Sequence, residues 1–367
     1  MNPKYATLFQ TYTLNNGVTI KNRLVVAPMT HFGSQADGLI SDQERTFLSN
    51  RAGDMGMFIT AATLVQKDGK AFHGQPEATG EHCLDSLKET AQILQQQGAK
   101  AILQIHHGGS KAMDDLLDGL DKISASASEA EHAREATAKE VEALITSYAQ
   151  AADLALRAGF DGVEIHGANT YLIQQFYSAQ SNRRNDQWGG SLENRMRFPL
   201  AVIDAVVAVR EKHQRNDFII GYRFSPEEAG EDGLTMTETG ALIDALIQKP
   251  LQYLHVSLWE FDKKIRRGGD TAQTRIQFIH DRINGKLPLI GVGNLFTADQ
   301  ILAAYETGWA EFIALGKTVM INPHIATQIR EGREDEIETQ LDPTRADHYS
   351  LPDTLWGFAS SGQLNRE

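Results

Sequence analysis

The chain has 367 residues, of which 41% are hydrophobic and 23% are charged, a balance typical of a globular enzyme and not of a fibrous or disordered protein. Its formal net charge of −13 opposes binding to nucleic acid or to an anionic membrane surface. Its single cysteine, Cys83, excludes an intrachain disulfide, a Cys-ligated iron–sulfur cluster and a multi-cysteine zinc site.

Targeting segments are not evident either. No apolar run approaches the roughly 20 residues of a membrane span, and residues 1–22 lack the apolar core of a signal peptide. With the lone cysteine, these features predict a cytoplasmic protein with no membrane and no nucleic-acid partner. A homo-oligomer is compatible with the sequence, which does not decide the oligomeric state.

Short, β-forming apolar runs alternate with longer amphipathic stretches, and no linker rich in Pro, Gly or Ser separates two halves. Each run is apolar for long enough to be buried on both faces, as parallel strands are. The runs are Leu24–Ala27, Met57–Ala61, Ala101–Ile105, Gly162–His166, Phe218–Arg223, Gln252–Ser257, Leu287–Val292 and Phe312–Leu315. Eight strand-then-helix units predict an α/β fold, a (β/α)₈ TIM barrel that forms a single domain over residues 1–367; a doubly wound sheet is the alternative.

Helix boundaries are marked by capping residues. Four pairs have the spacing of a capping box, which satisfies free backbone N–H groups at a helix start: Ser86 with Glu89, Thr137 with Glu140, Thr235 with Glu238, and Thr297 with Gln300. Gly98, Gly159 and Gly308 stand where helices should end. After the third strand, the acidic segment Gly108–Ala136 is longer than a barrel connection requires, and we expect an extended surface lid or a solvated loop there.

Polar residues follow nearly every predicted strand. In a barrel the active site is built at the C-terminal ends of the strands, so these positions matter most. They include Thr30, Thr63, Gln104, His106, His166, Asn169, Tyr171, Arg223, Trp259, Asn294 and Lys317.

The last two strand ends predict a phosphate site. Gly291–Asn294 and Gly316 let backbone N–H groups approach phosphate oxygens, a helix begins at Thr297, and Lys317 supplies positive charge. Alternatively, these glycines only form tight turns. A Walker loop is excluded because Glu311 stands where its first glycine belongs, and Gly291-Val292-Gly293 lacks the third glycine of a dinucleotide fingerprint.

Four segments together resemble the old yellow enzyme family of FMN-dependent ene-reductases: Lys21–Arg23 with Pro28-Met29-Thr30, Leu103–His106, Glu164–Leu172, and Ser181–Arg195. The resemblance extends from about Tyr5 to beyond Lys317. The stretch from His166 to Arg195 is the most specific part of it, whereas Pro-Met-Thr alone is a weak motif.

The resemblance implies an FMN-binding domain with the flavin across the barrel mouth. Its contacts would come from Pro28, Met29, Thr30, Ala62, Gln104, Arg223, Gly293, Gly316 and Lys317. The Gln104 amide can offer both a donor and an acceptor, and a fixed guanidinium at Arg223 would stabilise negative charge on the reduced flavin. The family usually has Arg where this chain has Lys317, so charge is kept and bidentate geometry is lost.

The resemblance also implies the catalytic residues. His166 and Asn169 would donate to a substrate carbonyl oxygen, and Tyr171 would be the proton donor. The implied reaction is reduction of the C=C bond of an α,β-unsaturated carbonyl compound by hydride from flavin N5, with NADH or NADPH as reductant. The alternatives are an NADH or NADPH oxidase, a quinone reductase or a dienoyl-CoA-reductase-like flavoenzyme in the same family, and a phosphate-binding barrel without flavin.

Two further patterns are a pair of adjacent histidines and a basic segment. His106 and His107 suggest a metal, but neighbours on a strand point to opposite faces and no other ligands complete a set, so we expect no metal site. The basic residues Lys263, Lys264, Arg266 and Arg267 are either a solvated loop or a grip for an anionic substrate or for nicotinamide phosphates. The sequence does not assign roles to residues 108–136 and 259–270.

Overall fold

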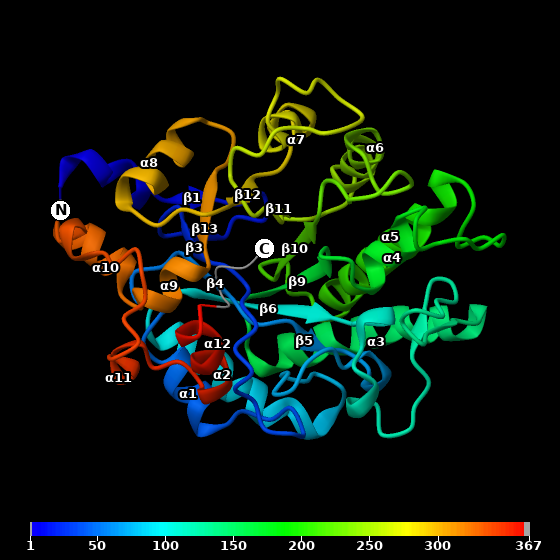
Figure 1. The fold of residues 1–367 in the computed structure, drawn as a ribbon. Coiled ribbons are helices and arrows are strands. Elements are labelled where there is room, and N and C mark those ends of the chain that lie inside the picture. The colour runs from blue at the N-terminus through cyan, green and yellow to red at the C-terminus, as the bar shows by residue number, and fades with distance from the viewer. Residues whose placement is uncertain (1, 363–367) are drawn as a thin grey trace.

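The computed structural model describes residues 2–362; residue 1 and residues 363–367, the ends of the predicted 1–367 domain, lie outside the described residues. Eight parallel strands close into a barrel (Figure 1). They are β3 (Leu24–Val26), β4 (Met57–Ile59), β6 (Lys100–His106), β9 (Gly162–Gly167), β10 (Ile219–Phe224), β11 (Tyr253–Val256), β12 (Leu289–Val292) and β13 (Phe312–Leu315). The pairings of β4 with β6 and of β13 with β3 complete the ring, so the predicted (β/α)₈ barrel is confirmed and the doubly wound sheet is wrong.

The barrel interior is a packed apolar core. Successive strand residues point to opposite faces, and one alternating set fills the interior: Val25, Ala27, Met57, Ile59, Ile102, Ile219, Tyr253, Ile290, Val292, Phe312 and Ala314. A hairpin of β1 (Tyr12–Thr13) and β2 (Thr19–Ile20) contributes Leu14 and Ile20 to the same cluster. The polar strand-end residues therefore lie above a barrel interior that apolar side chains fill.

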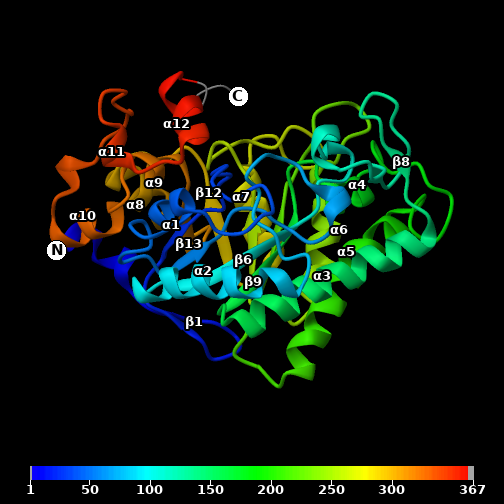
Figure 2. The ribbon, with the colours of Figure 1, turned by 90° about the horizontal axis from the view of Figure 1, so that it is seen from below.

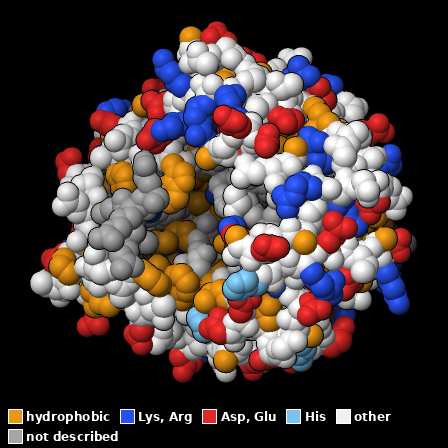
Figure 3. Space-filling view, turned by 45° about the vertical axis from the view of Figure 1, so that its right-hand side comes forward, with side chains coloured by type: hydrophobic (Ala, Val, Ile, Leu, Met, Phe, Trp, Pro, Cys, Tyr) orange, Lys and Arg blue, Asp and Glu red, His pale blue; other side chains and the backbone are white. Residues whose placement is uncertain are grey.

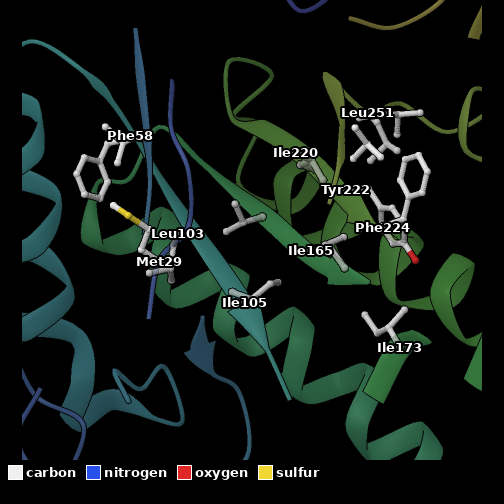
Figure 4. Close-up of a cluster of buried hydrophobic side chains, with 14 of the residues drawn as sticks. Met29, Phe58, Leu103, Ile105, Ile165, Ile173, Ile220, Tyr222, Phe224 and Leu251 are labelled. Atoms are coloured by element: carbon white, nitrogen blue, oxygen red, sulfur yellow. The ribbon is translucent and has the colours of Figure 1, made fainter. Parts of the chain in front are cut away.

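A second apolar layer joins the outer strand faces to the helices. Figure 4 shows part of it, with Leu103, Ile105, Ile165, Ile220 and Phe224 on neighbouring strands. The covering helices are α2 (Leu84–Gln96), α3 (Ala138–Ala158), α5 (Leu192–Lys212), α6 (Met236–Leu246), α7 (Arg275–Ile283) and α8 (Ala298–Glu306). Burial on both faces explains why the strand sequences are continuously apolar.

Three of the four predicted capping boxes are present, at Thr137, Thr235 and Thr297. The prediction at Ser86 is wrong because α2 already begins at Leu84. The Ser86 hydroxyl instead accepts a hydrogen bond from the backbone N–H of Ile40, and its predicted partner Glu89 binds Arg45. Tertiary contacts thus use both polar groups. Gly98, Gly159 and Gly308 all adopt positive φ at helix ends, as expected.

The additional elements are β5 (Thr63–Leu64), α1 (Asp42–Leu48), α4 (Leu172–Tyr177), α9 (Lys317–Ile321), α10 (Ile325–Glu331), α11 (Ala346–Tyr349) and α12 (Asp353–Ser360). Short 3-10 helices cover Pro3–Phe9, Lys67–Gly69, Glu81–Cys83, Gly109–Lys111, Asp114–Leu116 and Glu334–Glu336. Figure 2 shows α11 and α12 on the side of the barrel away from α3 and α5.

The segment from Gly108 to Ala136 is packed onto the barrel. Its strand β7 (Ile123–Ser124) pairs with β8 (Arg134–Glu135), and Ile123, Ala125 and Ala136 are buried. The Arg184 guanidinium donates to the carbonyls of Ala125 and Ala136. The expectation of a solvated loop is therefore wrong: its acidic side chains are at the surface, but its apolar residues join the core.

Candidate active site

The register of the strands brings the polar residues of four neighbours together at the barrel mouth. Gln104 of β6 lies beside Glu164 of β9. His166 of β9 lies beside Arg223 of β10, which in turn lies beside His255 of β11. A single arc of strand ends therefore carries an amide, a carboxylate, two imidazoles and a guanidinium.

A cavity of about 410 Å³ opens at this mouth. Seven of the residues predicted from the sequence line it: Pro28, Met29, Asn169, Arg223, Gly293, Gly316 and Lys317. Figure 3 shows a hollow in one face of the molecule, with hydrophobic side chains along its wall and Lys and Arg side chains gathered above it. The other predicted residues are not part of this lining: Thr30, Ala62, Gln104, His166 and Tyr171.

Among the residues that line the cavity, Arg223 gives the clearest indication of a bound ligand. Its side chain is only 8% exposed, yet its guanidinium makes no hydrogen bond or ion pair with the described residues. Burial lowers the pKa of Arg223, and the nearby Glu164 opposes that shift. Because a buried cation without an acceptor is costly, this geometry favours a ligand that offers hydrogen-bond acceptors to the guanidinium.

The part of the cavity formed after β12 and β13 suits a phosphate. A Cβ at Gly293 would lie 2.1 Å from the backbone nitrogen of Phe261, so only glycine fits there. Gly316 immediately precedes α9, and the Lys317 ammonium lies 5.0 Å from the centre of the Trp259 ring. Burial lowers the pKa of Lys317. A buried guanidinium with no partner among the described residues, together with a glycine cradle and a lysine, fits FMN, which carries carbonyl and nitrogen acceptors on its ring and a phosphate on its side chain.

Sequence reasoning missed the polar network beneath the cavity. The fully buried Glu164 carboxylate accepts hydrogen bonds from Gln104 Nε2 at 2.8 Å, the Tyr253 hydroxyl at 3.0 Å and His255 Nδ1 at 2.9 Å. Burial raises the pKa of Glu164, but His255, Arg223 and Gln104 outweigh burial and hold this pKa below its usual value. A charged residue inside an otherwise apolar strand was the signal that could have revealed this network.

His166 and Asn169 form a pair at the mouth. Asn169 Nδ2 lies 3.4 Å from His166 Nε2, so one oxygen atom can reach both nitrogens. The Ser257 hydroxyl donates to Asn169 Oδ1 at 2.8 Å, which turns the amide nitrogen of Asn169 toward His166. Burial, together with His106 and Arg223, holds the pKa of His166 well below its usual value, so the imidazole is neutral.

Tyr171 lies against two imidazole rings. Its ring centre is 4.4 Å from that of His106, in an edge-to-face arrangement, and 5.4 Å from that of His166. Burial raises the pKa of Tyr171 and lowers that of His106 to about 3. A phenol that keeps its proton therefore stands beside two neutral rings.

Two glutamines of α4 hold this region in place and were also missed. Gln175 accepts hydrogen bonds from the Ser110 N–H and the Ser124 hydroxyl, and its amide donates to the carbonyls of Gly108 and Thr170. Gln174 accepts the N–H of Thr170, a β-branched residue at φ 63°. Consecutive amides inside a short apolar helix were the sequence signal for this anchoring role.

The adjacent histidines and the basic segment are both engaged in local contacts. His107 Nε2 lies 2.9 Å from Asp68. In the basic loop, Glu227 accepts the backbone N–H groups of Arg266 and Arg267. Within residues 2–362, no three His, Cys, Asp or Glu side chains are grouped to hold a metal ion, and no helix is long and apolar enough to cross a membrane.

Comparison with known proteins identifies the family. Residues 7–336 match the model of the NADH:flavin oxidoreductase / NADH oxidase family. The chain is 46% identical over 359 residues to a probable NADH-dependent flavin oxidoreductase, YqiG, of Bacillus subtilis (strain 168), covering 97% of this chain and 96% of that protein. It is 36% identical over 360 residues to the NADH:fumarate oxidoreductase of Klebsiella pneumoniae (strain 342), covering 96% of this chain but only 39% of that longer protein.

The fold agrees with this relationship. The old yellow enzyme homologue of Zymomonas mobilis superposes with a TM-score of 0.78 at 24% identity, covering 94% of this chain and 99% of the other. The resemblance noted in the sequence is thus confirmed, as are FMN as cofactor and NADH or NADPH as reductant. With its closed parallel barrel and its mouth suited to a flavin, the chain belongs to the NADH:flavin oxidoreductase / NADH oxidase family, that of the old yellow enzymes.

Proposed function

We propose that the chain forms one FMN-binding domain over residues 1–367 and reduces the activated C=C bond of small α,β-unsaturated carbonyl compounds. When bound at the mouth, FMN would supply the two-electron chemistry that links oxidation of NADH or NADPH to reduction of the alkene. Gly293, Gly316 and Lys317 would hold its phosphate. The polar edge of the ring would accept or donate hydrogen bonds with Arg223, Gln104 and Thr30. The ring would pack near Pro28, Met29 and Ala62.

The substrate carbonyl is bound by His166 and Asn169. Their nitrogens, 3.4 Å apart, both donate to one oxygen when the imidazole proton is on Nε2. Two converging donors stabilise the negative charge that reaches this oxygen as the alkene accepts hydride. Because the pKa of His166 is held far below neutral, this donor carries no full charge and binds the neutral substrate without a counter-ion.

Tyr171 completes the reaction by protonating the α-carbon. Its raised pKa keeps the phenol protonated at neutral pH, and its place beside His106 and His166 puts it next to the oxygen-binding pair. The single observation that carries this proposal is the clustering of His166, Asn169 and Tyr171 beside the unpartnered Arg223.

The test separates the two half-reactions. Anaerobic protein is reduced with NADH or NADPH and then mixed with cyclohexenone, with oxygen or with a quinone in parallel stopped-flow experiments. The proposal expects rapid reoxidation by cyclohexenone and a saturated ketone as product. Reoxidation by oxygen or quinone alone would contradict ene-reduction and favour the oxidase or quinone reductase alternatives. A protein that binds no flavin would contradict the cofactor assignment itself.

A further inference from the structure

Glu164 is a buried carboxylate that has no role in the chemistry described above. It lies inside the barrel, fully excluded from solvent, between Gln104 on one side and Tyr253 and His255 on the other. Its first oxygen, Oε1, accepts from Gln104, and its second, Oε2, accepts from both Tyr253 and His255. All three partners are donors, as an ionised carboxylate requires.

This arrangement fixes which way the Gln104 amide faces. A carboxylate can only accept, so the amide nitrogen of Gln104 must point at Glu164. One N–H of that nitrogen is used in this contact. The second N–H and the carbonyl oxygen Oε1 make no hydrogen bond with the described residues. The amide therefore retains one donor and one acceptor side by side, which is the complement of a flavin pyrimidine edge with its N–H and carbonyl groups.

Tyr253 and His255 are held in place on the other side of the carboxylate. A Cβ at Gly221 would lie 2.1 Å from Cζ of Tyr253, so a glycine at this position makes room for the Tyr253 ring inside the barrel. The pairing of β10 with β11 places Tyr253 beside Gly221 and His255, two residues later, beside Arg223. Two donors on Oε2 prevent Glu164 from rotating away from Gln104.

We propose that Glu164 is a positioning residue that orients the Gln104 amide toward the FMN ring and balances the charge of Arg223. The inference rests on FMN binding, which the family establishes, and does not depend on enone reduction. Both Glu164 oxygens accept hydrogen bonds from protein donors, so Glu164 acts through Gln104 and through its charge.

Glu164→Gln tests orientation by reversing it. Tyr253 and His255 are donors, so they hold the oxygen of the new amide where Oε2 was, and its nitrogen faces Gln104. Gln104 must then turn its oxygen inward and present a donor to the N–H of the flavin. We expect the dissociation constant of FMN, measured by fluorescence titration of folded apoprotein, to rise about tenfold or more. Loss of the anion should also raise the flavin midpoint potential.

Two comparison variants separate orientation from charge. Glu164→Asp keeps the charge but withdraws the carboxylate by one methylene, so it should weaken FMN binding while shifting the midpoint potential less than Glu164→Gln. In a Gln104→Leu background, Glu164→Gln should weaken FMN binding much less than in the parent, because the amide it orients is gone and only its effect on the charge of Arg223 remains. Equal weakening in both backgrounds would overturn the proposal.

A measurement on the parent protein guards against variants that do not fold. Neutron diffraction locates the amide deuterons of Gln104. The proposal expects one of them between Gln104 Nε2 and Glu164, and a Gln104 oxygen facing Glu164 would contradict it. Failure of cyclohexenone turnover with normal FMN binding would affect only the proposed reaction and leave this inference intact.

Discussion

At the scale of single residues, the site is organised by groups that cannot pair within the protein. Arg223 is buried without an acceptor, and the Nδ1 atom of His166 and the Nε2 atom of His106 are buried without partners among the described residues. A fold tolerates such groups when a ligand satisfies them or when they are neutral. The low pKa values of the two histidines meet the second condition, and FMN would meet the first at Arg223.

Tyr171→Phe should separate the two half-reactions. The hydroxyl is proposed to act only when the alkene is protonated, so flavin reduction by NADH should be nearly unchanged. Reoxidation by cyclohexenone should slow by roughly 10²–10⁴-fold, the usual value of a lost general acid. Stopped-flow absorbance of each half-reaction measures both rates. Unchanged reoxidation would mean that water or another group supplies the proton.

The pH dependence of enone reoxidation follows from the same residues. Burial raises the pKa of Tyr171 above its usual value of 10, so the proton it donates is lost only as pH rises past 10. His166, with its pKa well below 6.5, stays neutral through the neutral range. The rate should therefore be flat from about pH 7 to 9 and fall only at higher pH. A break near pH 6.5 to 7 would show that a histidine titrates in the step.

At the scale of secondary structure elements, α4 connects the loop that carries Asn169 and Thr170 to the insert at 108–136. Its Gln175 side chain makes hydrogen bonds to both segments and is itself buried. The strained backbone at Asn169 and Thr170, with φ of 57° and 63°, is held by this contact and by Gln174. Asn169, which we propose as a catalytic residue, is thus positioned by a helix that does not line the cavity.

Gln175→Leu should loosen both segments together. The substitution removes the oxygen that accepts from both the buried Ser110 N–H and the buried Ser124 hydroxyl, at a cost of roughly 1–3 kcal/mol for each buried group. We expect a lower melting temperature, faster hydrogen exchange in 108–136 and a raised KM for cyclohexenone. Gln150→Leu is the matched control, since Gln150 is exposed on α3 and makes no side-chain hydrogen bond with described residues. If the two variants behave alike, α4 does not anchor the insert.

At the scale of the whole molecule, the proposed flavin site is built from the same strands that close the barrel. The residues proposed to hold FMN come from the ends of strands in all parts of the ring, from β3 to β13. A ligand that bridges them favours the closed barrel over the unfolded chain.

Removal of FMN should therefore destabilise the entire barrel in one transition. With free FMN at about 100 times its dissociation constant, linkage predicts about 2.7 kcal/mol of added stability. The melting temperature of the apoprotein should rise with the concentration of added FMN. Riboflavin, which lacks the phosphate, should raise the melting temperature less. Equal shifts from riboflavin and FMN would show that Gly293, Gly316 and Lys317 do not hold a phosphate.

The sequence by itself determined the architecture and much of the site. Continuous apolar strands and three of the four capping boxes follow from local periodicity and backbone hydrogen bonding, which act over a few residues. His166, Asn169 and Tyr171 could be found because they lie close together in one motif. The Glu164 network and the contacts of Gln175 with the insert could not, since the partners in these contacts are 50 or more residues away in the chain. Strand register and helix packing alone bring those partners together, and the same tertiary contacts explain why Ser86 is no cap and why the acidic insert is packed.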